Sequence, residues 1–190
     1  VATVSTKVYL HREQAVTAED RIAEFEHACD ILGVEDYEII VPGKQSELHL
    51  YPMGEMVQKL DARMADWQPD EVLIPLPAAH QDHVYMYQAA IAACRQSQSK
   101  SHIKLVAAYE YPSSGWGPGG DESPSRGGMY VNIADYIVKK IAAVQAYKTA
   151  LHKDGGLITI PAVVTLAKLR GLESGFDSAE LFRILKMRVS

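Results

Sequence analysis

The stretch that decides the fold is EVLIPLPAAHQDHVYMYQAAIAAC, residues 71–94. It opens with the apolar run EVLIPL at residues 71–76, which is typical of a β-strand covered on both faces. An alanine-rich segment with helical periodicity follows, from about Asp82 to Arg95. A buried strand that leads directly into a helix is one unit of an α/β fold, and two histidines and an aspartate stand where the strand passes into the helix.

The same alternation extends in both directions along the chain. Upstream, the sequence predicts strands at residues 1–10 and 37–41 and helices at residues 17–32 and 53–67. Downstream, it predicts a buried strand at residues 103–109, a short strand at 129–133 and a long helix at 135–152. We therefore expect an α/β fold, a Rossmann-like three-layer sandwich with a mostly parallel sheet flanked by helices, in which residues 1–190 form a single domain.

The amino-acid composition and net charge indicate which kinds of molecule this protein could bind. A hydrophobic fraction of 47% and a charged fraction of 23% are those of a soluble globular protein, and no apolar run approaches the roughly 20 residues of a membrane span. The net charge of −5 and the scattered basic residues disfavour nucleic acid and anionic lipid. We expect a small molecule or another protein as partner, and the sequence leaves the oligomeric state open, a homo-oligomer included.

The two cysteines, Cys29 and Cys94, fall in predicted helices among apolar neighbours. This placement favours buried free thiols and a reducing compartment, so we expect a cytoplasmic protein.

The cluster His80-Gln81-Asp82-His83 allows two interpretations. In α/β folds, ligands bind at the carboxyl ends of strands, so His83 could bind a metal in the first helical turn. Asp82 could then orient a ring by accepting its N–H, and His80 could act as acid or base. Alternatively, Asp82 caps the helix and both histidines are solvated. The four residues alone do not decide between a metal site and a capped helix.

Further segments, in the same order along the chain, resemble the LmbE/PIG-L family of zinc-dependent de-N-acetylases. The segments are RIAE at residues 21–24 with ILGV at 31–34, QPDEV at 68–72, the H-x-D-H motif at 80–83, YEYPSS at 109–114, VNIADYIVKKIAA at 131–143, RG at 170–171 and AELF at 179–182. Each match is short, but together they lie in register over most of the chain.

The resemblance implies a zinc hydrolase that removes an N-acetyl group from an amino sugar or an amino-sugar conjugate. It implies that His83 is a zinc ligand. It also implies that His80 is a catalytic residue, protonated so that it stabilises the oxyanion and protonates the leaving amine, and that Asp82 holds His80 in this form. The expected cofactor is zinc, and the expected partner is a small N-acetylated sugar or conjugate.

Three further residues are candidates for substrate binding: Arg21, Glu110 and Trp116. Arg21 resembles an arginine that the family places near the substrate cleft, although its spacing from Glu24 equally suits an ion pair within one helix. Glu110 follows a predicted strand, where ligands collect. Trp116 lies in a Gly-rich loop and, with Tyr111, could offer an aromatic wall to a sugar ring, although exposed loop aromatics without such a role are nearly as common.

The sequence also departs from the family. The P-H-P-D-D-E motif, which in the family provides two zinc ligands and the general base, occurs nowhere in these 190 residues, and we expect it to lie with a first strand upstream of Val1. Ala78 stands where the family often has an aspartate, and Tyr147 where a histidine is common. The alternative function is therefore that of a catalytically inactive relative, which keeps the fold as a sugar-binding or interaction module.

Overall fold

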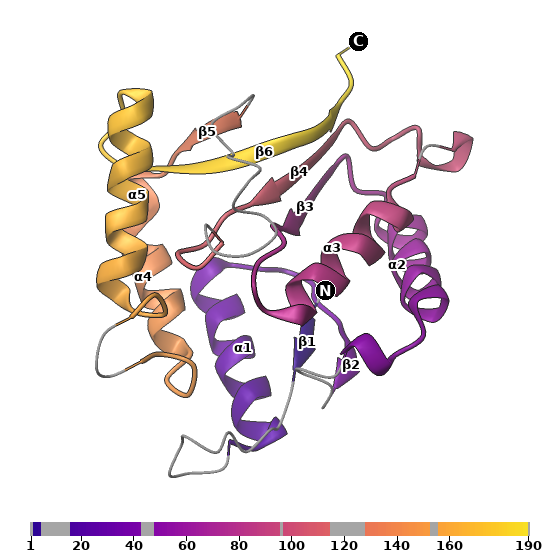
Figure 1. Ribbon diagram of the computed structural model, residues 1–190, viewed down its shortest axis with the longest axis horizontal. Coiled ribbons are helices and arrows are strands. Elements are labelled where there is room, and N and C mark those ends of the chain that lie inside the picture. Colours follow the sequence, from indigo (N-terminus) through magenta and orange to yellow (C-terminus); the bar gives the residue numbers. More distant parts are fainter. Residues whose placement is uncertain are drawn as a thin grey trace. The chain divides into compact units, whose positions relative to one another are not determined.

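The computed structural model describes residues 2–4, 16–42, 48–95, 97–114, 128–152 and 156–189 (Figure 1). By the contacts within the chain, these residues group into two compact units. Unit 1 comprises Val1–Glu47 and Asn132–Ala179, and unit 2 comprises Leu48–Val131 and Glu180–Ser190. Every helix in the described ranges is too short or too polar to cross a membrane. The expectation that residues 1–190 form a single domain stays a prediction.

Unit 1 consists mainly of helices. Its elements are β1 (Ala2–Val4), α1 (Ala18–Leu32), β2 (Ile39–Pro42), the short 3-10 helix η3 (Ala134–Tyr136), α4 (Ile137–Ala146) and α5 (Ile160–Ser174). Strands β1 and β2 pair in parallel, and α4 packs against both α1 and α5. Helix α1 has the predicted limits, because the Thr17 hydroxyl accepts a hydrogen bond from the Asp20 N–H (3.1 Å) and Gly33 ends the helix with φ of 76°.

Small side chains form the contact between α1 and α4. Ala28, Ala143 and Ala146 are buried there, and Ile31 and Tyr147 pack against them. Because alanine occupies little space, the two helices approach each other closely. Tyr147, which stands where the family often has a histidine, therefore contributes its ring to the packing of this helix pair.

Unit 2 contains a four-stranded sheet in the order β3-β4-β6-β5. The strands are β3 (Glu71–Pro75), β4 (Leu105–Tyr109), β5 (Gly128–Asn132) and β6 (Ala179–Met187), and the helices are η1 (Leu48–Leu50), α2 (Met53–Trp67), α3 (Gln81–Ala93) and η2 (Gln98–Lys100). Helix α3 packs against β3, and α2 packs against α3. Strand β4 is central, and its four residues at 105–108 are all buried, as the apolar run predicts.

The sheet is mixed, so the prediction of a mostly parallel sheet was wrong. Strand β4 is parallel to β3 but antiparallel to β6. Periodicity predicts the crossover through α3 that makes β3 and β4 parallel, but it does not contain the pairing of β6, which follows α4 and α5 and enters the sheet between β4 and β5. The sequence also predicts one long helix at residues 135–152, but α4 ends at Ala146.

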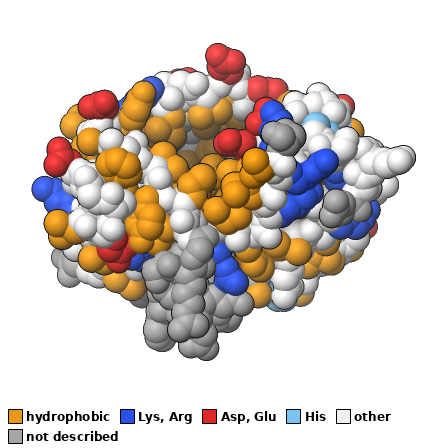
Figure 2. Space-filling model, turned by 90° about the horizontal axis from the view of Figure 1, so that it is seen from above, with side chains coloured by type: hydrophobic (Ala, Val, Ile, Leu, Met, Phe, Trp, Pro, Cys, Tyr) orange, Lys and Arg blue, Asp and Glu red, His pale blue; other side chains and the backbone are white. Residues whose placement is uncertain are grey.

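Hydrophobic side chains also reach the surface. Figure 2 shows them on one face of the molecule among charged groups of both signs. In unit 1, Val138 on α4 is 75% exposed and Leu172 on α5 is 82% exposed. Exposed apolar side chains are common on monomers and also occur in subunit interfaces, so the oligomeric state stays open.

Candidate active site

The H-x-D-H segment begins helix α3 in unit 2, directly after the carboxyl end of β3. His80 is the N-cap of α3, and Asp82 and His83 lie in its first turn. The Leu76 N–H donates to the Tyr109 carbonyl (3.0 Å), so the ends of β3 and β4 are joined just before the segment. The segment therefore lies, as predicted, at the carboxyl ends of two parallel strands, which is where α/β folds commonly bind ligands.

His80 caps the helix with its own ring. The ring Nδ1 accepts a hydrogen bond from the Asp82 backbone N–H (3.3 Å) and lies 4.0 Å from Asp82 Oδ2. The His80 side chain is 38% exposed, whereas that of Asp82 is buried. The alternative of a capped helix is thus partly correct, but the capping side chain belongs to His80 and not to Asp82.

His83 contacts Tyr111 from the loop that follows β4. Its Nδ1 forms a hydrogen bond with Tyr111 Oη, and the two rings meet edge to face with centroids 4.7 Å apart. Burial, together with the neighbouring His80, lowers the pKa of His83 from its usual value. The neutral imidazole, which is the form that binds metals, is therefore favoured at neutral pH.

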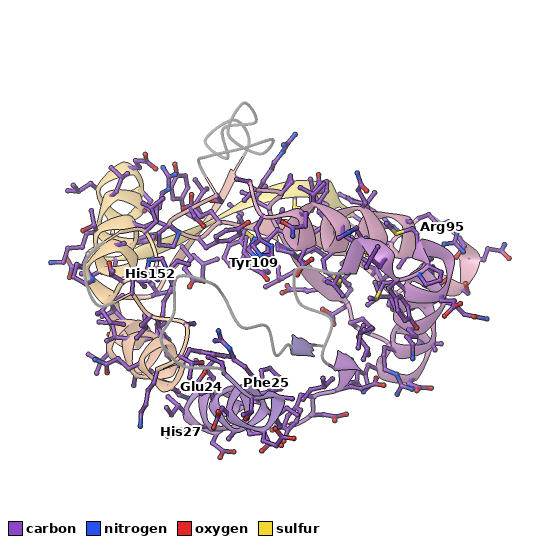
Figure 3. All side chains as sticks on the ribbon, turned by 60° about the horizontal axis from the view of Figure 1, so that its bottom comes forward. Glu24, Phe25, His27, Arg95, Tyr109 and His152 are labelled. Carbon is purple, nitrogen blue, oxygen red and sulfur yellow. The ribbon has the colours of Figure 1, made fainter. Side chains whose placement is uncertain are left out.

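The loop that carries Tyr111 is itself held by hydrogen bonds. The Tyr111 N–H donates to Ser114 Oγ (3.2 Å), and the Ser114 hydroxyl donates to the Tyr111 carbonyl (2.8 Å). Burial, and to a lesser extent Tyr109, raises the pKa of Tyr111 well above its usual value, so its hydroxyl keeps the proton. The Tyr109 ring, labelled in Figure 3, lies 6.4 Å from that of Tyr111.

The structure brings three of the predicted site residues together in unit 2. His80, Asp82 and His83 share the start of α3, with the two imidazole centroids 5.6 Å apart. Glu110 is half-buried in the same unit, next to Tyr111 in the chain. Trp116 lies outside the described residues. Residue types and spacing predict the histidines and Asp82, but the contact between His83 and Tyr111 was not predicted.

Arg21 lies in unit 1 on helix α1. Its Nη1 is 3.5 Å from Glu24 Oε2, so the ion pair within one helix is present. Glu24, labelled in Figure 3, also accepts hydrogen bonds from Thr149 N (2.7 Å) and Thr149 Oγ1 (2.6 Å), and thereby links α1 to the turn after α4. A structural role for the pair is thus visible, and substrate binding by Arg21 stays a prediction.

A zinc site needs more ligands than the described residues bring together. Catalytic zinc usually has three protein ligands and one water. Within the described ranges, no group of three or more His, Cys, Asp or Glu side chains is placed to share a metal ion. The His83 ring is anchored by Tyr111 and could serve as one ligand, so zinc binding stays a prediction.

Comparison with known proteins supports the resemblance. The family described as PIG-L, GlcNAc-PI de-N-acetylase, matches residues 4–94, which include the H-x-D-H segment. This match confirms the resemblance predicted from the motifs. No curated protein matches the sequence significantly.

Solved structures share the fold. The conserved protein TT1542 from Thermus thermophilus is similar with a TM-score of 0.67 and 22% identity, covering 92% of this chain and 77% of that one. The N,N'-diacetylchitobiose deacetylase from Pyrococcus horikoshii has a TM-score of 0.66 and 22% identity, covering 88% of this chain and 63% of that one. GalB, the 4-carboxy-2-hydroxymuconate hydratase from Pseudomonas putida, has a TM-score of 0.64 and 20% identity, covering 95% of this chain and 78% of that one. At these identities the likeness shows the fold and not the reaction.

Proposed function

Because residues 4–94 match the PIG-L family, we propose that this chain is a zinc-dependent hydrolase that removes an N-acetyl group from an amino sugar or an amino-sugar conjugate. The observation that carries the proposal is the start of α3, where the H-x-D-H segment follows β3 and Tyr111 anchors His83. Support for the substrate class comes from the diacetylchitobiose deacetylase with the same fold.

Amide hydrolysis needs an activated water and a stabilised oxyanion, because an amide is a poor electrophile. A bound zinc ion supplies both, since it polarises the carbonyl and lowers the pKa of its water to about 7. In the proposal, His83 is one ligand of that ion. The motif that gives the family its other ligands and its general base is absent from these 190 residues, so His83 is the only ligand that the proposal assigns.

His80 is the proposed acid. Asp82 would hold its ring, because the Asp82 backbone N–H donates to His80 Nδ1 (3.3 Å) and the buried Asp82 Oδ2 lies 4.0 Å from the same nitrogen. The ring is partly exposed and its centroid is 5.6 Å from that of His83, so both rings can reach the same substrate. His80 would then donate a proton to the leaving amine and a hydrogen bond to the oxyanion.

The proposed substrate-binding residues are Arg21, Glu110 and Trp116. A carboxylate and a guanidinium hydrogen-bond to sugar hydroxyls, and an aromatic face packs against the apolar face of a sugar ring. Of the three, Glu110 is the one described in the same unit as His83.

The test is release of free amine from N,N'-diacetylchitobiose or N-acetylglucosamine by the full natural chain. We expect the wild type to release amine, His80→Ala to lose roughly 10²–10⁴-fold in rate, and His83→Ala to fall to background. His27→Ala is the matched control, because His27 is an exposed histidine on α1 and its loss should leave the rate unchanged.

The alternative function gives a different result in the same experiment. A catalytically inactive, sugar-binding relative would bind the acetylated sugar without releasing amine, and His83→Ala would not change that binding. Undiminished amine release by His83→Ala would also contradict the proposed role of this residue.

A further inference from the structure

Three groups in unit 2 form a continuous chain of hydrogen bonds. His83 Nδ1 is hydrogen-bonded to Tyr111 Oη, and the Tyr111 hydroxyl is hydrogen-bonded in turn to the Leu76 carbonyl oxygen (2.7 Å). This series of hydrogen bonds joins the first turn of α3, the loop after β4 and the segment just after β3.

The direction of these bonds follows from the chemistry of the groups. A carbonyl oxygen can only accept, so the single hydroxyl proton of Tyr111 points to Leu76. Towards His83 the Tyr111 oxygen can then only accept, and His83 Nδ1 must carry the proton of that bond. A neutral imidazole has one N–H, so its Nε2 is left with a free lone pair.

We propose that Tyr111 is a positioning residue that fixes His83 in the Nδ1–H tautomer and keeps the Nε2 lone pair available to a ligand. The inference rests on the proposed function only for the identity of that ligand, a zinc ion. Metal-binding histidines commonly donate their second ring N–H to a neighbouring acceptor, which sets the tautomer and the ring orientation.

The surroundings of Tyr111 favour this direction over the reverse. Leu76 is 1% exposed, so its carbonyl would be costly to leave without a donor. The two hydrogen bonds between Tyr111 and Ser114 hold the backbone that carries the phenol. The edge-to-face contact with the tyrosine, at an interplanar angle of 84°, also restricts rotation of the His83 ring.

The experiment reads the ring nitrogens of His83 in the metal-free protein by long-range ¹H–¹⁵N correlation at neutral pH. The sequence has seven histidines, and His83→Gln assigns the relevant signals by their loss. We expect a protonated Nδ1 and a bare Nε2 in the wild type. Tyr111→Phe should move the proton wholly or partly to Nε2, because it removes the acceptor. Tyr109→Phe, the matched control, removes a hydroxyl from the neighbouring ring and should leave the tautomer unchanged.

A protonated Nε2 in the wild type would by itself overturn the inference. The test therefore gives an answer even if the Tyr111→Phe variant does not fold. An unchanged tautomer in folded Tyr111→Phe would also overturn it. In a second measurement, titration with zinc alone, we expect affinity to fall about 10–100-fold in Tyr111→Phe and not in Tyr109→Phe.

Measuring the His83 tautomer together with amine release distinguishes failure of this inference from failure of the proposed function. A protonated Nδ1 in a chain that releases no amine would contradict the proposed function and leave the inference intact. A bare Nδ1 in an active deacetylase would contradict the inference alone.

Discussion

At the scale of single residues, the two histidines of the H-x-D-H segment have different surroundings and therefore different proposed tasks. His80 is partly exposed, caps α3 and lies near a buried carboxylate, so its ring is held in place and can still contact a substrate. His83 is half-buried and hydrogen-bonded to Tyr111, and its lowered pKa suits a neutral ligand. We therefore propose different tasks for two residues of the same type because their neighbours differ.

The segment could be singled out from the sequence because two histidines and an aspartate stand where a predicted strand passes into a predicted helix. The partner of His83 could not be predicted, because Tyr111 is 28 residues away and the contact depends on the pairing of β3 with β4. The alternative of a capped helix named the wrong capping side chain. Aspartate is the common capping residue, and only the fold shows that the His80 ring reaches the Asp82 N–H first.

Lys100 provides a test at the residue scale, because it is a nearly buried lysine with two partners. Its Nζ donates to Asp61 on α2 and to the Ala93 carbonyl at the end of α3. We expect Lys100→Met to lower the free energy of unfolding by about 1.5–3 kcal/mol, since both partners lose a charged donor. Urea denaturation followed by circular dichroism measures the change.

Arg95 is the matched control for Lys100. It pairs with the same carboxylate, Asp61, at 3.2 Å, but its side chain is 60% exposed. Exposed ion pairs contribute little, so Arg95→Met should change stability by less than about 1 kcal/mol. Equal losses in the two variants would contradict the argument that burial makes the lysine important.

At the scale of elements, periodicity predicts the helices and strands between residues 17 and 109 well, whereas most of the strand predicted at residues 1–10 lies outside the described residues. Helix α2 has the predicted limits, and β3, α3 and β4 differ by one or two residues. Helix α5 and strand β6 were not predicted, although Thr159, Pro161 and Gly175 mark the two ends of α5. The insertion of β6 beside β4 depends on contacts distant in sequence, which local patterns do not contain.

Gly171 near the end of α5 provides a test at the element scale. A Cβ there would lie 2.6 Å from the Phe176 carbonyl oxygen and 2.9 Å from the Asp177 carbonyl carbon. We expect Gly171→Ala to destabilise the protein by about 1–3 kcal/mol, because the backbone after the helix must move away. Thermal unfolding measures the change.

Gly54 in α2 is the control, since a Cβ there meets no heavy atom of the described residues within 4 Å. Gly54→Ala should be neutral or stabilise by up to about 1 kcal/mol through helix propensity. A stabilising Gly171→Ala would show that the close approach of the chain after α5 is not present in solution.

At the scale of the whole molecule, each compact unit contains one buried thiol. Cys29 lies in unit 1 and Cys94 in unit 2, at 5% and 7% exposure. Burial raises the pKa of both thiols, so each forms less of the reactive thiolate at a given pH. The two cysteines therefore report separately on the unfolding of the two units.

Pulsed alkylation across a urea titration, read by mass spectrometry, tests the prediction that residues 1–190 form a single domain. If they do, Cys29 and Cys94 should become reactive at the same urea concentration, because a single domain unfolds cooperatively. Two separated midpoints would contradict the prediction and show that the units unfold independently.

The central claim is that His83 holds the metal of a deacetylase, and amine release with zinc analysis of the same samples tests it most directly. The account predicts that the full natural chain carries zinc and releases amine from N,N'-diacetylchitobiose or N-acetylglucosamine. It also predicts that His83→Ala loses both properties while His27→Ala keeps both. A folded His83→Ala variant with the zinc content and rate of the wild type, or a natural chain with neither zinc nor amine release, would contradict it.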